Sequence, residues 1–353
     1  MEGLHVESGN EHISRRKDFL SISPELKGYL ARHGRHAKLP ATYQDLLAFS
    51  DSYPLMDKNH EPTYWSSVIY PDDIRRALYP KLTSIYSLLG TGDLQAVPHL
   101  YVERVDYCEF GNSRPFRVRV VNQYNDNYDH FYVKVADASR VYGLELEHLL
   151  SPNRINYLAW EGTLVEEHIA GVPGDVFMRD FIEREDMNRV RIAKEFVKFG
   201  ERCFIRLLGD MRSYNYVVDI TPDFEEIQYR VRAIDFDQQS YEGRRNIYLP
   251  QFFKENLPAV QLCSELLNYP TMQQYQDEER SLIARRYVAE RERIADLLRA
   301  MKNHPQEPMV KVMELRSELG EFHKTDAFAN CDSMGAVVEM NLDVTLGKHL
   351  ATL

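Results

Sequence analysis

Apolar and polar residues alternate along several short segments in the middle of the chain. Residues 116–120 and 131–135 each place Phe, Val and Val at every second position, with charged or polar side chains between them. A period of two is typical of a strand with one buried face. Residues 155–160 and 163–169 are two further strand candidates, separated by a Glu-Gly pair. The pattern therefore predicts a small antiparallel sheet over residues 101–170.

Elsewhere apolar residues recur at three- and four-residue steps, which is typical of helices. This spacing predicts helices over residues 43–49, 71–86, 139–150 and 190–208. We expect Pro80 to kink or split the second of these helices, because its ring removes a backbone donor and collides with the preceding turn.

These elements divide the chain into three regions. Residues 1–100 are expected to form an N-terminal helical extension, residues 101–170 a small lobe built on the sheet, and residues 171–353 a larger, mostly helical lobe. A hairpin formed by residues 216–220 and 227–234 interrupts the helical lobe. The expected fold class is therefore α+β, with a small antiparallel β-sheet lobe and a larger helical lobe.

Charge and composition narrow the classes of partner. The 353 residues carry 43 Lys and Arg against 54 Asp and Glu, a formal net charge of -11. An acidic chain is repelled by nucleic acid and by anionic membranes, so neither is expected as a partner. Four scattered cysteines without a CxxC pair signal neither a zinc site nor a disulfide framework. We expect a cytoplasmic protein.

The candidate chemistry lies in the helical region. Asp210 and Asn215 stand five residues apart in a loop, and Asp235 ends the following hydrophobic strand. Phosphoryl transfer uses such a set: one carboxylate orients the attacking hydroxyl, while an amide oxygen and a second carboxylate hold Mg²⁺ against the phosphates. The spacing thus predicts Asp210 as catalytic base and Asn215 and Asp235 as metal ligands.

At this point the sequence resembles the protein-kinase-like superfamily, in particular its aminoglycoside and choline phosphotransferase branch, over residues 105–249. The resemblance implies a bilobal kinase-like fold, ATP and Mg²⁺ as cofactors, and a hydroxyl acceptor on a small molecule or a protein. It places Lys134 at the α/β-phosphates of the nucleotide. Glu145 would orient Lys134, with Glu147 as the alternative that helical phase leaves open. Residues 164–169 resemble the hinge that binds a purine, which makes Glu166 and His168 candidate nucleotide contacts.

Several positions depart from the family pattern. Gly111 is the only glycine between residues 100 and 142, so any cover over the phosphates would come from residues 110–114. Tyr132 replaces the usual small residue beside the adenine. Asp237 replaces the usual glycine of the second metal motif, where it is either another Mg²⁺ ligand or a solvated carboxylate. Arg212 either stabilises charge on the transferred phosphate or forms a structural ion pair.

Two classes of function follow. The retained Lys134, Asp210, Asn215 and Asp235 favour an ATP- and Mg²⁺-dependent phosphotransferase. The missing glycine loop and Tyr132 favour a pseudokinase, which would engage a partner protein through residues 1–100 or through the acidic hairpin tip at residues 221–226. Transfer of AMP or another group in place of phosphate is a third alternative.

Overall fold

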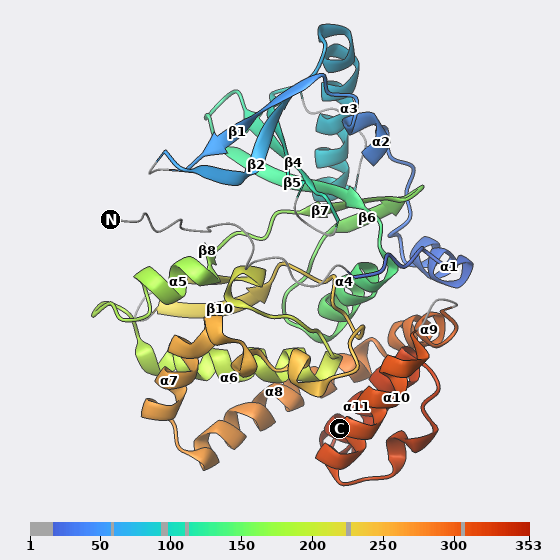
Figure 1. Cartoon of the computed structure of the whole chain (residues 1–353), viewed down its shortest axis with the longest axis vertical. Helices are drawn as coiled ribbons and strands as arrows, with labels where there is room; N and C mark the ends of the chain where they lie inside the picture. The colour runs from blue at the N-terminus through green and yellow to red at the C-terminus, as the bar shows by residue number, and fades with distance from the viewer. Residues whose placement is uncertain (1–16, 58–59, 93–97, 110–112, 224–226, 305–307) are drawn as a thin grey trace, which may run out of the picture. The chain divides into compact units, whose positions relative to one another are not determined.

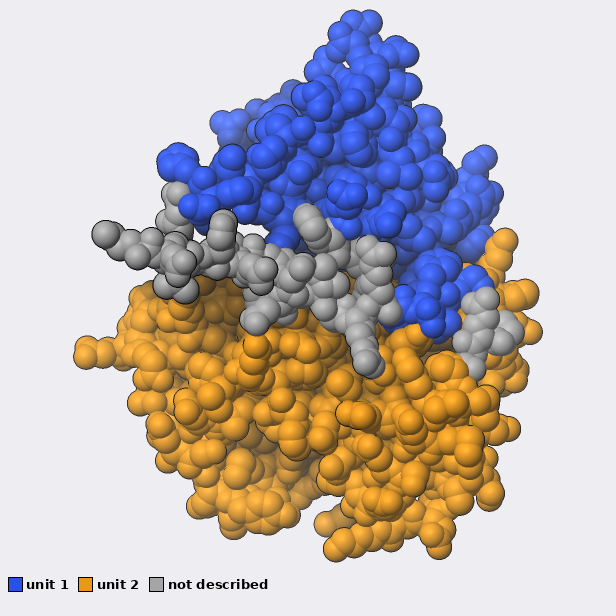
Figure 2. Space-filling view, in the orientation of Figure 1, with its two compact units in different colours: residues 1–21, 35–137, 156–168 blue, residues 22–34, 138–155, 169–353 orange. Residues whose placement is uncertain are grey.

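The chain forms two compact units, which are coloured separately in Figure 2. Unit 1 comprises residues 1–21, 35–137 and 156–168, and unit 2 comprises residues 22–34, 138–155 and 169–353. The computed structural model describes residues 17–57, 60–92, 98–109, 113–223, 227–304 and 308–353.

Unit 1 is built on an antiparallel sheet of seven strands in the order β1-β2-β3-β4-β5-β7-β6, counted over its described residues (Figure 1). The predicted strands around residues 116–120, 131–135, 155–160 and 163–169 are confirmed as β4 to β7. The strands are β1 (Asp51–Met56), β2 (Pro62–Ile69), β3 (Leu100–Tyr107), β4 (Phe116–Asn122), β5 (Tyr128–Val135), β6 (Tyr157–Trp160) and β7 (Thr163–Glu167).

One face of this sheet carries the hydrophobic core of unit 1. The helix α3 (Asp72–Thr91) packs against β3 and β4 and buries Leu78, Leu82 and Ile85. The short helix α2 (Tyr43–Leu46) adds to the same core. Pro80 does not split α3, because the helix continues through it, and the expected kink stays a prediction. Burial of the apolar stripe on both sides of Pro80 compensates for the one backbone hydrogen bond that proline removes.

Residues 1–100 differ from the helical extension that the sequence predicts. Two strands, β1 and β2, lie in this region, and β2 pairs with β3 through Ser66 and Ser67. Exposed polar and aromatic side chains hid their alternation, because β1 has no buried residue and β2 buries only Ser67 and Val68. The described part of this region therefore combines helices with two strands of the sheet, and its boundary with the predicted small lobe at residue 100 falls at the start of β3.

Unit 2 is mainly helical and contains a three-stranded antiparallel sheet in the order β10-β9-β8. The predicted hairpin is confirmed as β9 and β10, and the predicted helices over residues 139–150 and 190–208 as α4 and α6. The strands are β8 (Val172–Pro173), β9 (Tyr216–Pro222) and β10 (Ile227–Ala233). The helices are α1 (Pro24–Arg32), α4 (Ala138–Leu150), α5 (Gly174–Asp180), α6 (Arg189–Arg206), α7 (Leu257–Leu266), α8 (Tyr269–Ala289), α9 (Arg291–Lys302), α10 (Met309–His323) and α11 (Met334–Leu350). Short 3₁₀ turns are η1 (Ser213–Asn215), η2 (Arg245–Tyr248), η3 (Pro250–Phe252), η4 (Lys254–Asn256) and η5 (Ala327–Asn330).

The long helix α6 is the centre of unit 2. The Asn188 side chain accepts a hydrogen bond from the backbone N–H of Arg191 and so caps the first turn. Apolar residues at helical spacing, including Ile192, Phe196 and Phe199, are buried. The neighbours α7, α8 and α11 pack on α6.

The two units together confirm the expected α+β class, with a small sheet unit and a larger helical unit. No helix in the described parts of the chain has the length and apolar character to cross a bilayer.

Candidate functional site

The segment after α6 holds the first group of predicted site residues. Leu207 adopts a left-handed conformation that ends α6, and Asp210 has a φ of 57°. The Gly209 N–H donates to the Gln238 carbonyl at 3.1 Å, and the Asp210 N–H donates to the Ile247 carbonyl at 3.0 Å. A non-glycine residue in this conformation is strained and persists only where the surroundings fix it. The two hydrogen bonds supply that constraint at Asp210.

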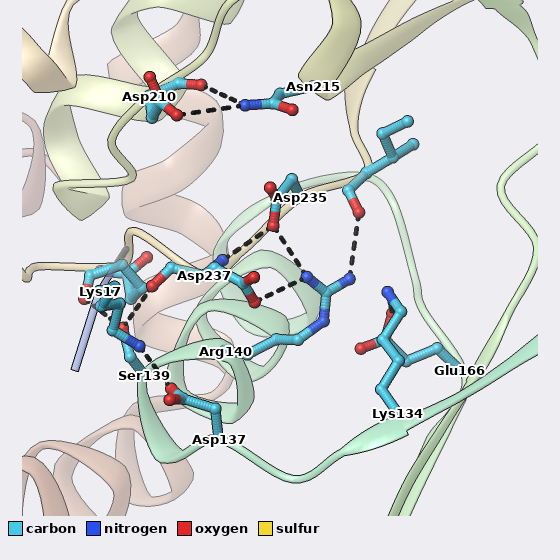
Figure 3. Close-up of polar contacts among 12 residues, drawn as sticks. Lys17, Lys134, Asp137, Ser139, Arg140, Glu166, Asp210, Asn215, Asp235 and Asp237 are labelled. Atoms are coloured by element: carbon cyan, nitrogen blue, oxygen red, sulfur yellow. Dashed lines mark hydrogen bonds and ion pairs between the residues drawn. The ribbon is translucent and has the colours of Figure 1, made fainter. Parts of the chain in front are cut away.

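Asn215 lies beside Asp210, as the motif predicts (Figure 3). Its Nδ2 donates to the Asp210 carbonyl oxygen at 2.7 Å and to Asp210 Oδ2 at 3.5 Å. The backbone carbonyl of Asn215 accepts hydrogen bonds from the backbone N–H of Ile234 at 3.0 Å and from that of Asp235 at 3.4 Å. Asn215 therefore links the two aspartate motifs of unit 2 into one site.

Arg212 forms a structural ion-pair network inside this site. Its Nε lies 2.8 Å from Asp210 Oδ1, and its Nη1 lies 2.9 Å from Glu255 Oε1. Burial raises the pKa of the Asp210 carboxyl, and the neighbouring Arg212 only partly opposes that effect. A carboxyl with a raised pKa holds its proton more readily, which is the direction that suits general acid–base chemistry.

The second aspartate motif carries a cation that the sequence did not reveal. The Arg140 guanidinium donates from Nη1 to Asp235 Oδ1 at 2.8 Å and to Asp237 Oδ1 at 3.0 Å (Figure 3). Its Nη2 donates to the Ile234 carbonyl at 3.2 Å. Only 2% of the Arg140 side chain is exposed, against 37% for Asp235 and 9% for Asp237. A buried positive charge is thus fixed between two of the predicted metal ligands.

Close packing of α4 places Arg140 in this position. A Cβ added at Gly143 would lie 2.9 Å from Phe236 Cβ, so the glycine allows the helix to approach the aspartate motif. The Ser139 hydroxyl lies within hydrogen-bond distance of the carbonyl oxygens of both Asp237 and Gln239, at 3.0 and 2.9 Å. These contacts fix the first turn of α4 against residues 235–239.

In the observed arrangement each carboxylate of this motif already bonds an internal cation through one of its two oxygens. A divalent cation needs carboxylate oxygens that are not already committed to another cation. Here Arg140 binds one oxygen each of Asp235 and Asp237. Over the described parts of the chain, moreover, no three or more His, Cys, Asp or Glu side chains are arranged to hold a metal ion.

Glu145 and Glu147 are both buried in unit 2. Glu145 Oε2 accepts from the Tyr29 hydroxyl at 2.5 Å and from Arg293 Nη2 at 2.7 Å. Glu147 forms an ion pair with Arg206, which overcomes the effect of burial and lowers the pKa of Glu147. Since Lys134 belongs to unit 1, its predicted partnership with either glutamate stays a prediction.

In unit 1, Lys134 and Glu166 form a buried ion pair. Lys134 Nζ lies 2.8 Å from Glu166 Oε2, and both side chains are less than 10% exposed. Glu166 stands opposite Tyr132 on β5 and Tyr157 on β6, so its backbone faces a sheet partner on either side. Any contact of Glu166 with a nucleotide would therefore come from its side chain.

His168, the other predicted nucleotide contact, follows β7 and is exposed. Its Nδ1 lies 3.2 Å from the Tyr132 hydroxyl, and its ring contacts that of His130 at a centroid distance of 5.6 Å. Although part of His168 is exposed, its ring is partly shielded from water by its neighbours, and this desolvation lowers the pKa of His168. Desolvation lowers the pKa of His130 to about 4, and Arg117 acts in the same direction on both. Tyr132 is also in contact with Lys134, whose Nζ lies 5.2 Å from the ring centroid.

The structure thus brings together Asp210, Asn215, Asp235 and Asp237 within unit 2, and Lys134, Glu166 and His168 in one region of the unit 1 sheet. Arg140 was not predicted from the sequence. The available signal was the second carboxylate of the Asp235-Phe236-Asp237 motif, because two carboxylates close together are stabilised by a nearby cation. The expected phosphate cover at residues 110–114 and the hairpin tip at residues 221–226 fall partly on residues 110–112 and 224–226, outside the described residues.

Comparisons with known proteins add a likeness to solved structures. No protein-family model and no curated protein matches the chain. Among the solved structures that match is that of the Neurospora crassa PAN3 pseudokinase, at 11% sequence identity and a TM-score of 0.21. The likeness covers 80% of this chain and 70% of that chain.

Proposed function

We propose that this chain is a kinase-like protein that works as a non-catalytic binding module, a pseudokinase, rather than as a Mg²⁺-dependent phosphotransferase. The proposal rests on one observation, the buried Arg140 guanidinium bonded to Asp235 and Asp237. The kinase-like assignment itself rests on the order of the motifs along the chain.

Charge explains why Arg140 weakens the metal site. Two carboxylates with one guanidinium leave a net charge near -1 at the motif, whereas the pair alone would offer -2 to a divalent cation. Mg²⁺ would also have to displace a guanidinium that is 2% exposed and is hydrogen-bonded to both carboxylates and to the Ile234 carbonyl. Because an unpaired buried charge costs several kcal/mol, of order 3–5, displacement is strongly disfavoured.

The contacts of Lys134 in unit 1 support the same proposal. Lys134, which the resemblance places at the phosphates, is in a buried ion pair with Glu166. Tyr132 packs against Lys134 and lies within hydrogen-bond distance of His168. A nucleotide phosphate would have to compete with the Glu166 carboxylate for the ammonium group.

The test compares wild type with Arg140→Met and Asp235→Ala in thermal unfolding, with and without millimolar MgCl₂ and ATP. A ligand that binds only the folded state raises its melting temperature. We expect no Mg²⁺-dependent shift in wild type, and a Mg²⁺-dependent gain in Arg140→Met, where the carboxylates lose their internal cation. MgCl₂ without ATP separates metal binding from nucleotide binding. A Mg²⁺-dependent shift with ATP in wild type that disappears in Asp235→Ala would overturn the proposal.

That contrary outcome would favour a second candidate, an ATP- and Mg²⁺-dependent phosphotransferase of the aminoglycoside and choline type. The arrangement of Asp210 and Asn215 supports it, because the two side chains lie in the relation that a catalytic base and its neighbouring ligand require. The raised pKa of Asp210 points the same way. Its acceptor would be a hydroxyl on a small molecule or a protein, and phosphate release from ATP, abolished in Asp210→Asn, would be the direct assay.

A further inference from the structure

A separate cavity of about 750 Å³ lies in unit 2, between α6, α8, α11 and the segment that contains η2 and η3. These three helices pack on one another (Figure 1). The volume is within the range of small-molecule sites, roughly 300–1,000 Å³. Arg140 and the aspartate motifs are not among the residues that line it.

The lining is rich in exposed apolar side chains. Phe252, Tyr269 and Phe322 line the cavity and are 58%, 68% and 47% exposed. Large apolar side chains gathered at one exposed place mark a binding site more often than scattered ones do. A second cavity of about 210 Å³ shares Leu249 and Gln276 with the first and continues between apolar residues of α6 and α7. The two cavities together offer room for an apolar body.

Two cations that line the same cavity have no carboxylate partner among the described residues. Arg280 is paired with Glu201 at 2.6 Å and with Asp277 at 3.4 Å. By contrast, the Arg245 guanidinium and the Lys348 ammonium form no ion pair with any carboxylate of the described residues. Arg245 stacks on Phe322, with its Cζ 4.4 Å from the ring centroid, which holds the guanidinium beside the apolar wall.

A buried hydroxyl provides an independent observation. Thr345 lines the cavity from α11, and its Oγ1 is buried without a hydrogen-bond partner among the described residues. Buried polar atoms are nearly always hydrogen-bonded, because an unmade bond costs about 1–3 kcal/mol. The hydroxyl lies behind the surface of the cavity, so an acceptor group in the cavity would reach it only if the Thr345 side chain turned toward that group.

We propose that this cavity binds an organic anion with an apolar body, whose carboxylate, sulfonate or phosphate group meets Arg245 and Lys348. Its apolar part lies against Phe322 and extends toward the smaller cavity. This site goes beyond the proposed function and does not depend on Arg140 or on nucleotide binding.

The test is a fluorescence titration of the full chain with 8-anilinonaphthalene-1-sulfonate, an anion with an aromatic body. We expect saturable binding that is weakened about fivefold in Arg245→Gln and in Lys348→Gln, since one partly exposed charge contact is lost in each. The matched control is Arg244→Gln, because Arg244 is the exposed neighbour of Arg245 and does not line the cavity. Unchanged melting temperatures separate a lost contact from unfolding, and Lys348, which is exposed, keeps the test decisive if Arg245→Gln unfolds.

Competition defines the chemistry of the ligand. We expect decanoate to displace the probe, and inorganic phosphate at the same concentration to leave it bound, because phosphate has no apolar body. Equal displacement by phosphate would overturn the proposed ligand class. The proposal would also fail if the probe did not bind, or if all three variants bound it as wild type does.

Discussion

The two aspartate motifs of unit 2 differ in how their charges are neutralised. Asp210 is paired with Arg212, two residues away in the chain, and 28% of that arginine side chain is exposed. Asp235 and Asp237 are paired with Arg140, about 95 residues away, which is 2% exposed. A local, half-exposed cation leaves a carboxylate able to exchange its partner, whereas a buried cation fixes the charges of its site. The cation at Asp210 is therefore local and partly exposed, whereas the cation at Asp235 and Asp237 is buried and comes from a distant helix.

The largest effect on stability is expected for Arg140→Met, which removes the buried cation and keeps most of the side-chain volume. We expect a loss of about 3 kcal/mol in the free energy of unfolding, at the low end for a broken buried pair because Asp235 is partly hydrated. Urea titration measures it. Adding Asp237→Asn should recover part of the loss, because a neutral amide replaces the more buried of the two unpaired carboxylates.

The control is Arg299→Met, which removes an exposed arginine that pairs with Asp296 one helical turn away. Such surface pairs contribute well under about 1 kcal/mol. If Arg140→Met lowered the free energy of unfolding by no more than Arg299→Met does, the ion pairs of Arg140 with Asp235 and Asp237 would have no structural role.

The next effect comes from Gly143→Ala, which disturbs the same cluster without altering a charge. The added Cβ would lie 2.9 Å from Phe236 Cβ and 3.2 Å from Gln239 Cβ, so α4 must shift away from the aspartate motif. We expect a loss of about 1–3 kcal/mol, as for other overpacked cores. Gly200→Ala in α6 is the matched control, since the nearest atom to its added Cβ is 3.7 Å away. Helix propensity predicts that this control is neutral or stabilising by up to about 1 kcal/mol. Equal losses of stability in both variants would contradict the close approach of α4 to the aspartate motif.

The fold was largely predictable because its signals are local. Alternation at residues 116–120 and 131–135 needs only neighbouring residues, and it predicted β4 and β5. The strands β1 and β2 escaped notice because an exposed edge region has no apolar alternation. Asp210 and Asn215 were found from their spacing, but Arg140 was not, since no sequence rule connects a residue of α4 with a motif about 95 positions later. Tertiary packing at Gly143 makes that connection.

The matched substitution at the local pair, Arg212→Met, should cost less than Arg140→Met. It leaves Asp210 and Glu255 without their shared cation, and their side chains are 11% and 16% exposed. We expect roughly 1–2 kcal/mol, between the values for surface and buried pairs, because Arg212 is half-buried and Asp210 accepts a proton readily. Urea titration beside Arg140→Met checks the order, and a larger loss at Arg212 would reverse the comparison between the two motifs.

The smallest effect concerns the pH dependence of stability at Asp210. Burial raises the pKa of this carboxyl above its ordinary value of 3.8, so between that value and the folded-state pKa the folded chain binds more protons than the unfolded chain. Stability contributed by Asp210 is therefore present at low pH and is lost as the pH rises through the folded pKa. Asp210→Asn cannot lose this proton, and its melting temperature relative to wild type should rise between pH 4 and pH 7. Asp332→Asn, which removes an exposed carboxylate, should show no such rise. A difference that stays flat with pH in Asp210→Asn would mean that Arg212 fully offsets the burial of Asp210, and that the two motifs are neutralised equally well.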